Sequence, residues 1–374
     1  MRTNFGLFVV IYFVVNITGV CLLENYIKED PYKNVRVEFP DDLCDDRELM
    51  LPDYRTLGRR TSEVKCMEYI WRIKYAQQRY ENRIRCEMQR GVTALLGGGA
   101  AAHGEYPHMG ALGWKAIVGK WIFKCGGSLI SEKFVLTAAH CSSVKKTDPT
   151  VSGFEPKIVR LGSKSISDTV DGRPAYDIGI RRFINHHRYK PSQHYFDVAL
   201  VELVEEATFN WKVHPACLWT TFDNPETGEL TGWGITEKDT LKTSPILQKA
   251  EIRIVDSVDC DSKLKYRHNR KWQGIMRHQL CAGDKSGRID TCQGDSGGPL
   301  QIVIPLPRSY YIVVPWNIHQ IVGVTSFGFG CARKDTPSVY TRVASFVGWI
   351  ENIVWPINIT RSHEDNEARF LFVT

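Results

Sequence analysis

From Leu95 onward, apolar residues occur in short runs separated by glycine, proline and aspartate. Such runs, rich in β-branched and aromatic residues and bounded by turn residues, predict short β-strands. Clear examples are Trp121–Phe123, Phe134–Thr137, Val198–Leu203 and Ile321–Thr325. No internal repeat interrupts them, so we expect this part of the chain to be all-β.

The preceding stretch has a different pattern. It is strongly charged, with an acidic cluster from Asp41 to Asp46, and between Ser62 and Gln89 its larger side chains fall near helical spacing. The positions with this spacing are Val64, Met67, Ile70, Trp71, Lys74 and Tyr75. This spacing predicts a helix. We interpret residues 22–94 as a pro-segment ahead of a domain formed by residues 95–374.

The first 21 residues have the layout of a secretory signal peptide. Arg2 precedes an apolar run from Phe5 to Val15, and smaller or polar residues follow at Thr18 and Gly19. The run is short for a membrane span, although an uncleaved anchor is the alternative interpretation. We therefore expect a secreted, extracellular protein with no membrane partner.

Composition narrows the classes of function. The chain is 43% hydrophobic, and its 48 Lys and Arg nearly balance its 42 Asp and Glu. This balance gives no support to nucleic-acid binding. Eleven cysteines in a secreted chain favour disulfide bridges, and ten would remain after removal of Cys21. No cysteine or histidine spacing indicates a zinc site. Asn358 begins an Asn-Ile-Thr glycosylation sequon.

Three short motifs carry candidate chemistry: Thr137–Cys141, Asp197–Leu200 and Gly294–Pro299. A serine hydroxyl needs an imidazole to accept its proton, and the imidazole needs a carboxylate to fix its tautomer. The predicted triad is therefore Ser296, His140 and Asp197. The backbone N–H groups of Gly294 and Ser296 could converge on a developing oxyanion. A chance match to the six-residue serine motif is on the order of one in ten million at a given position, whereas the other two motifs alone would be weak signals.

With these motifs in the order His, Asp, Ser, the chain resembles the trypsin-like, chymotrypsin-fold serine proteases from Leu95 to Trp355. Further signatures are Cys125–Ile130, Thr231–Gly234 and Pro337–Val343. The segments Gly104–Met109 and Pro215–Trp219 are most similar to arthropod proteases of the snake and clip-domain kind, or to venom proteases. The resemblance implies two packed antiparallel six-stranded β-barrels with a C-terminal helix, preceded by a short, disulfide-bridged, reduced clip-like pro-segment.

The resemblance also implies a substrate pocket. Asp290 matches the base of the pocket that binds Arg or Lys, and Ser326, Phe327 and Gly328 match the strand that holds the substrate backbone. Gly328 also matches a glycine of the pocket wall. Phe327 replaces a usual tryptophan. Ser338 replaces a usual pocket-wall glycine and would narrow the pocket, so a preference for smaller residues is the alternative to cleavage after Arg or Lys.

Activation is expected to follow the zymogen pattern of these proteases. In that pattern a new N-terminal amine folds inward and pairs with the carboxylate that matches Asp295. Alignment places this terminus at Leu95, which predicts cleavage after Ala94. Cleavage after Arg90 is the alternative, but it would leave Gly91–Ala94 ahead of the aligned terminus.

The same resemblance implies three disulfides, Cys125–Cys141, Cys260–Cys281 and Cys292–Cys331. Cys217 would then be unpaired within the protease domain. Its expected partner is Cys86, which leaves Cys44 to pair with Cys66 and would keep the pro-segment attached after cleavage.

The expected partners are protein substrates, an activating protease and serpin-type inhibitors. No cofactor or metal is expected. In particular, no calcium site is expected, because Ser163 stands where calcium-binding relatives have Glu. A catalytically silent, partner-binding homologue is the rival hypothesis, although all three triad members are present.

Overall fold

The computed structural model describes residue 32 and residues 34–89, 104–166, 169–170, 173–237, 242–283, 295–306, 317–329 and 336–356. The chain divides into a unit of residues 1–39 and a unit of residues 40–374. The second unit contains all the helices and strands that the structure describes.

The first barrel is closed by six antiparallel strands. In spatial order they are β1 (Met109–Lys115), β2 (Trp121–Leu129), β3 (Phe134–Thr137), β8 (Ala199–Leu203), β7 (Tyr176–Asn185) and β4 (Ile158–Leu161). All residues of β3, β4 and β8 are buried, and their apolar side chains, such as Leu136, Val159 and Leu200, belong to one hydrophobic core. The strands predicted over Phe134–Thr137 and Val198–Leu203 are confirmed, the second beginning at Ala199.

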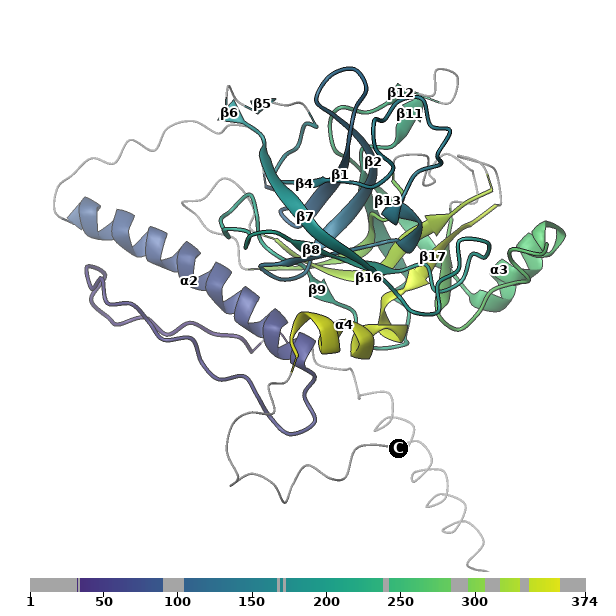
Figure 1. Ribbon diagram of the computed structural model, residues 1–374. Helices are drawn as coiled ribbons and strands as arrows, with labels where there is room; N and C mark the ends of the chain where they lie inside the picture. The colour runs from purple at the N-terminus through teal and green to yellow at the C-terminus, as the bar shows by residue number, and fades with distance from the viewer. Residues whose placement is uncertain are drawn as a thin grey trace, which may run out of the picture. The chain divides into compact units, whose positions relative to one another are not determined.

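The second barrel has the same number of strands. Their order is β15 (Pro299–Ile304), β10 (Thr227–Gly232), β13 (Gln248–Val255), β14 (Gln279–Ala282), β17 (Ser338–Arg342) and β16 (Ile318–Phe327). Pairing of β15 with β16 closes the ring, and β9 (Cys217–Leu218) adds to β16 in parallel. The predicted all-β architecture of two six-stranded barrels is thus confirmed (Figure 1). The remaining strands are β5 (Thr169–Val170), β6 (Arg173–Pro174), β11 (Ile235–Glu237) and β12 (Lys242–Thr243).

In the part of the chain that the structure describes, three α-helices lie outside the barrels: α2 (Thr61–Gln89), α3 (Ser257–Leu264) and α4 (Val347–Val354). Single 3-10 turns occur at η1 (Ala139–Ser142), η2 (Lys265–Arg267) and η3 (Val343–Ser345). The helices expected over Ser62–Gln89 and at the C-terminus are therefore confirmed. Among the described residues, no helix has the length and apolar character that crossing a membrane requires.

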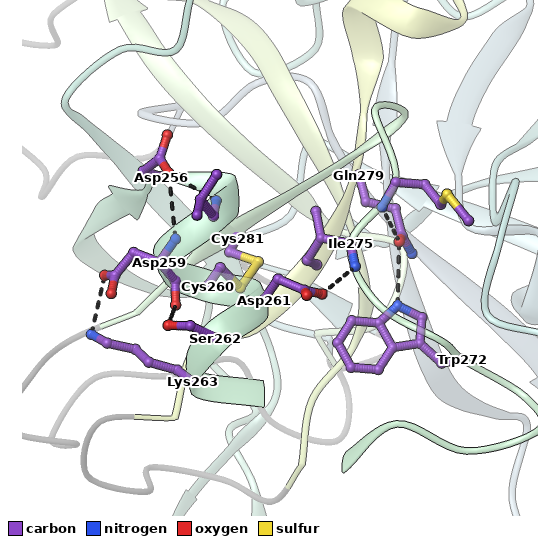
Figure 2. The surroundings of a disulfide bond; sticks show 12 residues. Asp256, Asp259, Cys260, Asp261, Ser262, Lys263, Trp272, Ile275, Gln279 and Cys281 are labelled. Atoms are coloured by element: carbon purple, nitrogen blue, oxygen red, sulfur yellow. Dashed lines mark hydrogen bonds and ion pairs between the residues drawn. A yellow bond between two sulfur atoms is a disulfide. The ribbon is translucent and has the colours of Figure 1, made fainter. Parts of the chain in front are cut away.

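Helix α3 is fixed at its N-terminus and in its middle (Figure 2). Asp256 caps it by accepting from the backbone N–H groups of Val258 and Asp259 at 2.8 and 3.4 Å. Its Cys260 is bonded to Cys281 of β14, and both cysteines are fully buried. The helix is thereby attached to the second barrel.

Helix α2 contacts helix α4 near its own first turn. Ser62 donates from its backbone N–H and its Oγ to Glu351 Oε1 of α4, at 2.9 and 2.7 Å. Arg60, just before the helix, pairs with the same carboxylate at 2.9 Å. Further along, Tyr69 donates its hydroxyl hydrogen to the carbonyl of Ile130 at 3.2 Å. The N-terminal segment is thus in direct contact with the barrels.

The disulfides agree with the implied pairing only in part. Cys125–Cys141 and Cys260–Cys281 are present as implied. The expected pair Cys292–Cys331 lies outside the described residues. The expected pairs Cys86–Cys217 and Cys44–Cys66 are wrong, because the structure has Cys66–Cys217 and Cys44–Cys86.

Helix geometry explains this correction. Cys66 lies in the part of α2 that contacts β9, so it meets Cys217 with a Cα–Cα distance of 5.1 Å. At a rise of about 1.5 Å per residue, Cys86 lies roughly 30 Å further along the helix axis and cannot reach the same partner. Cys86 instead bonds to Cys44 of the segment that precedes the helix.

Candidate active site

Asp197 and His140 are held together at the edge of the first barrel. His140 lies in η1, directly after β3, and Asp197 lies just before β8, the strand paired with β3. The imidazole Nδ1 is 2.8 Å from Asp197 Oδ2, and the backbone N–H of His140 donates to Oδ1 at 2.9 Å. Because both carboxylate oxygens are engaged, the imidazole is fixed in orientation.

The second barrel also contacts Asp197. Ser326 Oγ of β16 donates to Asp197 Oδ2 at 2.5 Å, and Thr341 Oγ1 of β17 donates to the backbone carbonyl of Asp197 at 2.7 Å. The sequence indicated Ser326 only as part of the substrate strand, and it gave no signal for Thr341. No local pattern could show these contacts, since the partners are 129 and 144 positions apart.

These contacts set the ionisation of the pair. Burial raises the pKa of Asp197, but the charge of His140 and hydrogen bonds from His140 and Ser326 outweigh burial, so the pKa lies below its usual value. Burial lowers the pKa of His140, but attraction and a hydrogen bond from Asp197 outweigh it, so the pKa is raised. The site therefore favours a carboxylate beside an imidazole that accepts a proton readily.

Ser296 is positioned by a tight turn against the first barrel. Its carbonyl accepts from the N–H of Gly126 of β2 at 2.8 Å, and the N–H of Gly298 donates to the carbonyl of Asp295 at 2.9 Å. Gly297 has φ of 76°, and a Cβ there would collide with Thr137 Oγ1, so glycine is required. Ser296 and His140 line one cavity of about 750 Å³.

The carboxylate of Asp295 lies against the segment that follows β10. Its Oδ1 accepts from the N–H of Gly234 at 2.9 Å. A Cβ at Gly232 or Gly234 would collide with the same carboxylate, so both glycines leave room for it. The residue directly before Ser296 is thus held by the second barrel.

The expected pocket-wall residues lie opposite each other. Gly328 directly follows β16, and Ser338 begins β17 with 1% of its surface exposed. A Cβ on Gly328 would lie 2.7 Å from Ser338 Oγ, so the hydroxyl faces that glycine closely. Phe327 stacks on His194 with centroids 4.5 Å apart and meets the ring of Trp272 edge-on at 5.6 Å.

Several predicted site residues lie outside the described residues, and their roles stay predictions. They are Ala94, Leu95, Asp290, Cys292, Gly294, Cys331 and Asn358. The proposed signal peptide, residues 1–21, lies outside as well.

One group in the described part of the chain has the spacing of metal ligands. Ring nitrogen and sulfur atoms of His140, Cys125 and Cys141 lie within 4.8 Å of one another. The two cysteines are bonded to each other, however, so neither offers the thiolate that a metal requires.

Comparisons with known proteins place this geometry in context. The Trypsin family matches residues 95–350. The chain is 35% identical to Serine protease snk of Drosophila melanogaster over 361 residues, which cover 90% of this chain and 76% of that protein. It is 40% identical to Serine protease Hayan of the same species over 71% of this chain, which is 39% of that longer protein.

Two further matches come from other animals. Clotting factor G beta subunit of Tachypleus tridentatus is 33% identical over 73% of this chain and 84% of that protein. Among solved structures, mouse neuropsin, a serine protease, matches with a TM-score of 0.52 and 28% identity over 68% of this chain and 97% of its own.

Proposed function

Because the chain belongs to the trypsin family of serine proteases, it is a serine endopeptidase, and we propose that it is a secreted zymogen that, once cut, cleaves after Arg or Lys. The observation that carries the proposal is the 2.8 Å contact between His140 Nδ1 and the buried carboxylate of Asp197. That contact leaves Nε2 as the ring nitrogen that can serve Ser296.

In the proposed mechanism, Ser296 Oγ attacks the scissile carbonyl carbon while His140 Nε2 accepts the hydroxyl proton. Asp197 stays ionised and stabilises the imidazolium that forms. The N–H groups of Gly294 and Ser296 stabilise the oxyanion. His140 then protonates the departing amine as the peptide bond breaks, and a water molecule hydrolyses the acyl-enzyme by the same steps, returning the proton to Ser296.

Selection of a basic residue rests on Asp290. A carboxylate at the base of a closed pocket would pair with the guanidinium or ammonium group of the substrate. The contact between Ser338 and Gly328 supports a pocket narrower than one with glycine at both positions. We expect the pocket to accept Arg and Lys at a reduced rate.

Control by cleavage rests on Asp295. In the uncut chain its carboxylate accepts from Gly234. A new amine at Leu95 would bring a full positive charge to this carboxylate, and a charge-assisted bond is about twice as strong as a neutral one. The exchange of partners would reorganise the turn that contains Ser296, which supports activation by cleavage after Ala94.

Secretion is supported by the N-terminal sequence pattern and by four disulfides among the described residues. Such bonds persist in oxidising compartments. The relative named as a clotting factor subunit is consistent with an extracellular setting. The proposed partners are protein substrates, an activating protease and serpin-type inhibitors.

The test uses the full chain secreted from a eukaryotic host, cut by candidate proteases. The active form is expected to begin at Leu95, to be labelled by an arginine-type phosphonate, and to hydrolyse Arg and Lys anilides. Ser296→Ala is the matched control and should abolish labelling and hydrolysis without loss of folding. An active form that begins at Gly91 would contradict the activation site, and hydrolysis confined to small residues would contradict the specificity.

A further inference from the structure

The cavity that contains Ser296 and His140 extends well beyond them. It continues along β2 and under the loop of residues 143–150, which follows the Cys125–Cys141 disulfide. Its apolar lining includes Trp114, Ile122 and Phe123. At about 750 Å³, it has room for more than one substrate side chain.

This cavity lies on the leaving-group side of the scissile bond. None of the residues that we assign to the substrate strand and the pocket wall, Ser326 to Gly328 and Ser338, lines it. Those residues would hold the acyl part of the substrate. His140, which must protonate the departing amine, does line it. The residues after the scissile bond would therefore enter this cavity.

The charge of the lining is positive. Lys124 and Lys145 contribute to it, and Asp148 is the one acidic side chain among the described residues that line it. Asp148 accepts from the N–H and Oγ1 of Thr150 at 3.0 and 2.5 Å and from Lys124 Nζ at 3.1 Å. These bonds, led by Thr150, lower the pKa of Asp148 to about 2, so it stays ionised and compensates Lys124.

Lys145 remains uncompensated. Its side chain is exposed at the rim of the cavity, and it forms no ion pair with any acid in the part of the chain that the structure describes. The carboxylate of Asp148 already interacts with three donor groups, two on Thr150 and one on Lys124. Lys145 therefore places an unpaired positive charge beside the apolar lining of the cavity, and this charge is complementary to a substrate carboxylate.

We propose that the loop of residues 143–150 selects protein substrates with an acidic side chain among the first residues after the scissile bond, and that Lys145 is the specificity-determining residue. The inference rests on the proposed function, because it assigns the substrate class of the same catalytic site. Lys124 is compensated by Asp148, so it adds no net charge to this selection.

The experiment compares quenched peptides that share the residues before the scissile Arg and differ only after it, with Glu or Gln at each of the first three positions. The activated protein should cleave the best Glu peptide with a kcat/KM about three to five times that of its Gln counterpart, the range expected for an exposed ion pair. The ratio should decline as salt is raised, because exposed charges are screened.

Two variants test the residue assignment. Lys145→Glu should bring the Glu-to-Gln ratio below one. Lys146→Glu makes the same charge change at the neighbouring exposed lysine, which does not line the cavity, and should keep the wild-type ratio. An Arg p-nitroanilide has no peptide residue after the scissile bond, so its kcat/KM in each protein reports overall activity, and the Glu-to-Gln ratio of each protein is compared beside it.

The outcomes separate this inference from the proposed function. Anilide hydrolysis with a Glu-to-Gln ratio of one in the wild type would overturn the inference alone. An equal decrease of the Glu-to-Gln ratio in both variants would also overturn it. The effect would then come from the overall charge of the loop and not from Lys145. Failure of every cut form to hydrolyse the anilide would overturn the proposed specificity and the inference with it.

Discussion

The backbone N–H of Phe196 donates to Nε2 of His278 at 3.3 Å, and the two rings stack with centroids 4.1 Å apart. Phe196 directly precedes Asp197 and has φ of 56°, the one positive φ among non-glycine residues in the described ranges. A left-handed conformation costs an L-residue roughly 1–2 kcal/mol. The contacts with His278 and the Arg188 guanidinium 4.0 Å above the ring offset that cost and fix the backbone that presents Asp197.

Phe196→Val and Phe196→Asn form a matched pair, because both remove the ring but only Asn tolerates a left-handed backbone. We expect Phe196→Val to lower the free energy of unfolding by about 1–2 kcal/mol more than Phe196→Asn. The kcat of Phe196→Val should also be about tenfold lower than that of Phe196→Asn, with little change in KM, because Asp197 is displaced. Urea unfolding and anilide kinetics measure both effects. Equal behaviour of the two variants would show that the backbone conformation has no role.

The His140–Asp197 pair predicts the acid limb of the pH profile. His140 must be neutral to accept the proton of Ser296. Asp197 raises the pKa of His140 above its ordinary value of 6.5, so kcat/KM should fall as the pH drops through this raised pKa. A limb centred well below pH 6.5 in the wild-type active form would contradict this electrostatic account.

Asp197→Asn removes the charge that raises the pKa of His140 and leaves burial as the main effect. The acid limb should therefore move to lower pH, while kcat falls by about four orders of magnitude because the imidazole loses its orienting carboxylate. Initial rates from pH 4 to pH 9, with circular dichroism to confirm folding, measure both effects. An unshifted limb would show that Asp197 does not control the ionisation of His140.

Features that are set by neighbouring residues could be predicted from the sequence, whereas features that join distant residues could not. The strand at Phe134–Thr137 and the helix from Thr61 follow from local patterns, and both are present. The triad candidates followed from three short motifs, two of which the structure brings to a 2.8 Å contact at His140 and Asp197.

Features that depend on tertiary packing could not be predicted. The bond from Ser326 to Asp197 joins residues 129 positions apart and has no local pattern. Cys66 and Cys86 share one helix, so the choice between them as partner of Cys217 depends on which turn of the helix contacts β9. The contact of Phe196 with His278 likewise appears only after both barrels have folded.

The observed disulfides predict how the cut protein behaves on a denaturing gel. Cys66–Cys217 would join the two chains after cleavage at Ala94, whereas Cys44–Cys86 lies wholly within the N-terminal chain. Without reductant, cut Cys66→Ser/Cys217→Ser should run as two bands and cut Cys44→Ser/Cys86→Ser as one. The free energy of unfolding of Cys66→Ser/Cys217→Ser should also be about 2–4 kcal/mol lower than that of the wild type. Two bands from both cut variants would indicate that Cys86 is the partner of Cys217, because each variant would then lack one end of the only bond between the chains.

Ser338 is expected to limit the rate on basic substrates, because its hydroxyl faces Gly328 across the proposed pocket. Ser338→Gly removes the group that narrows the pocket. We expect kcat/KM on Arg and Lys anilides to rise about tenfold, the effect of a small volume change in a specificity pocket. Glycine in a strand should lower the free energy of unfolding by about 0.5–1 kcal/mol.

Gly328→Ala makes the opposite change at the facing position. Its Cβ would lie 2.7 Å from Ser338 Oγ, so activity on both anilides should fall. The double variant Gly328→Ala/Ser338→Gly relieves this collision and should recover activity beyond the sum of the single effects, because residues in contact are not additive. Additive effects on kcat/KM would show that the two residues do not face each other across the pocket that binds substrate.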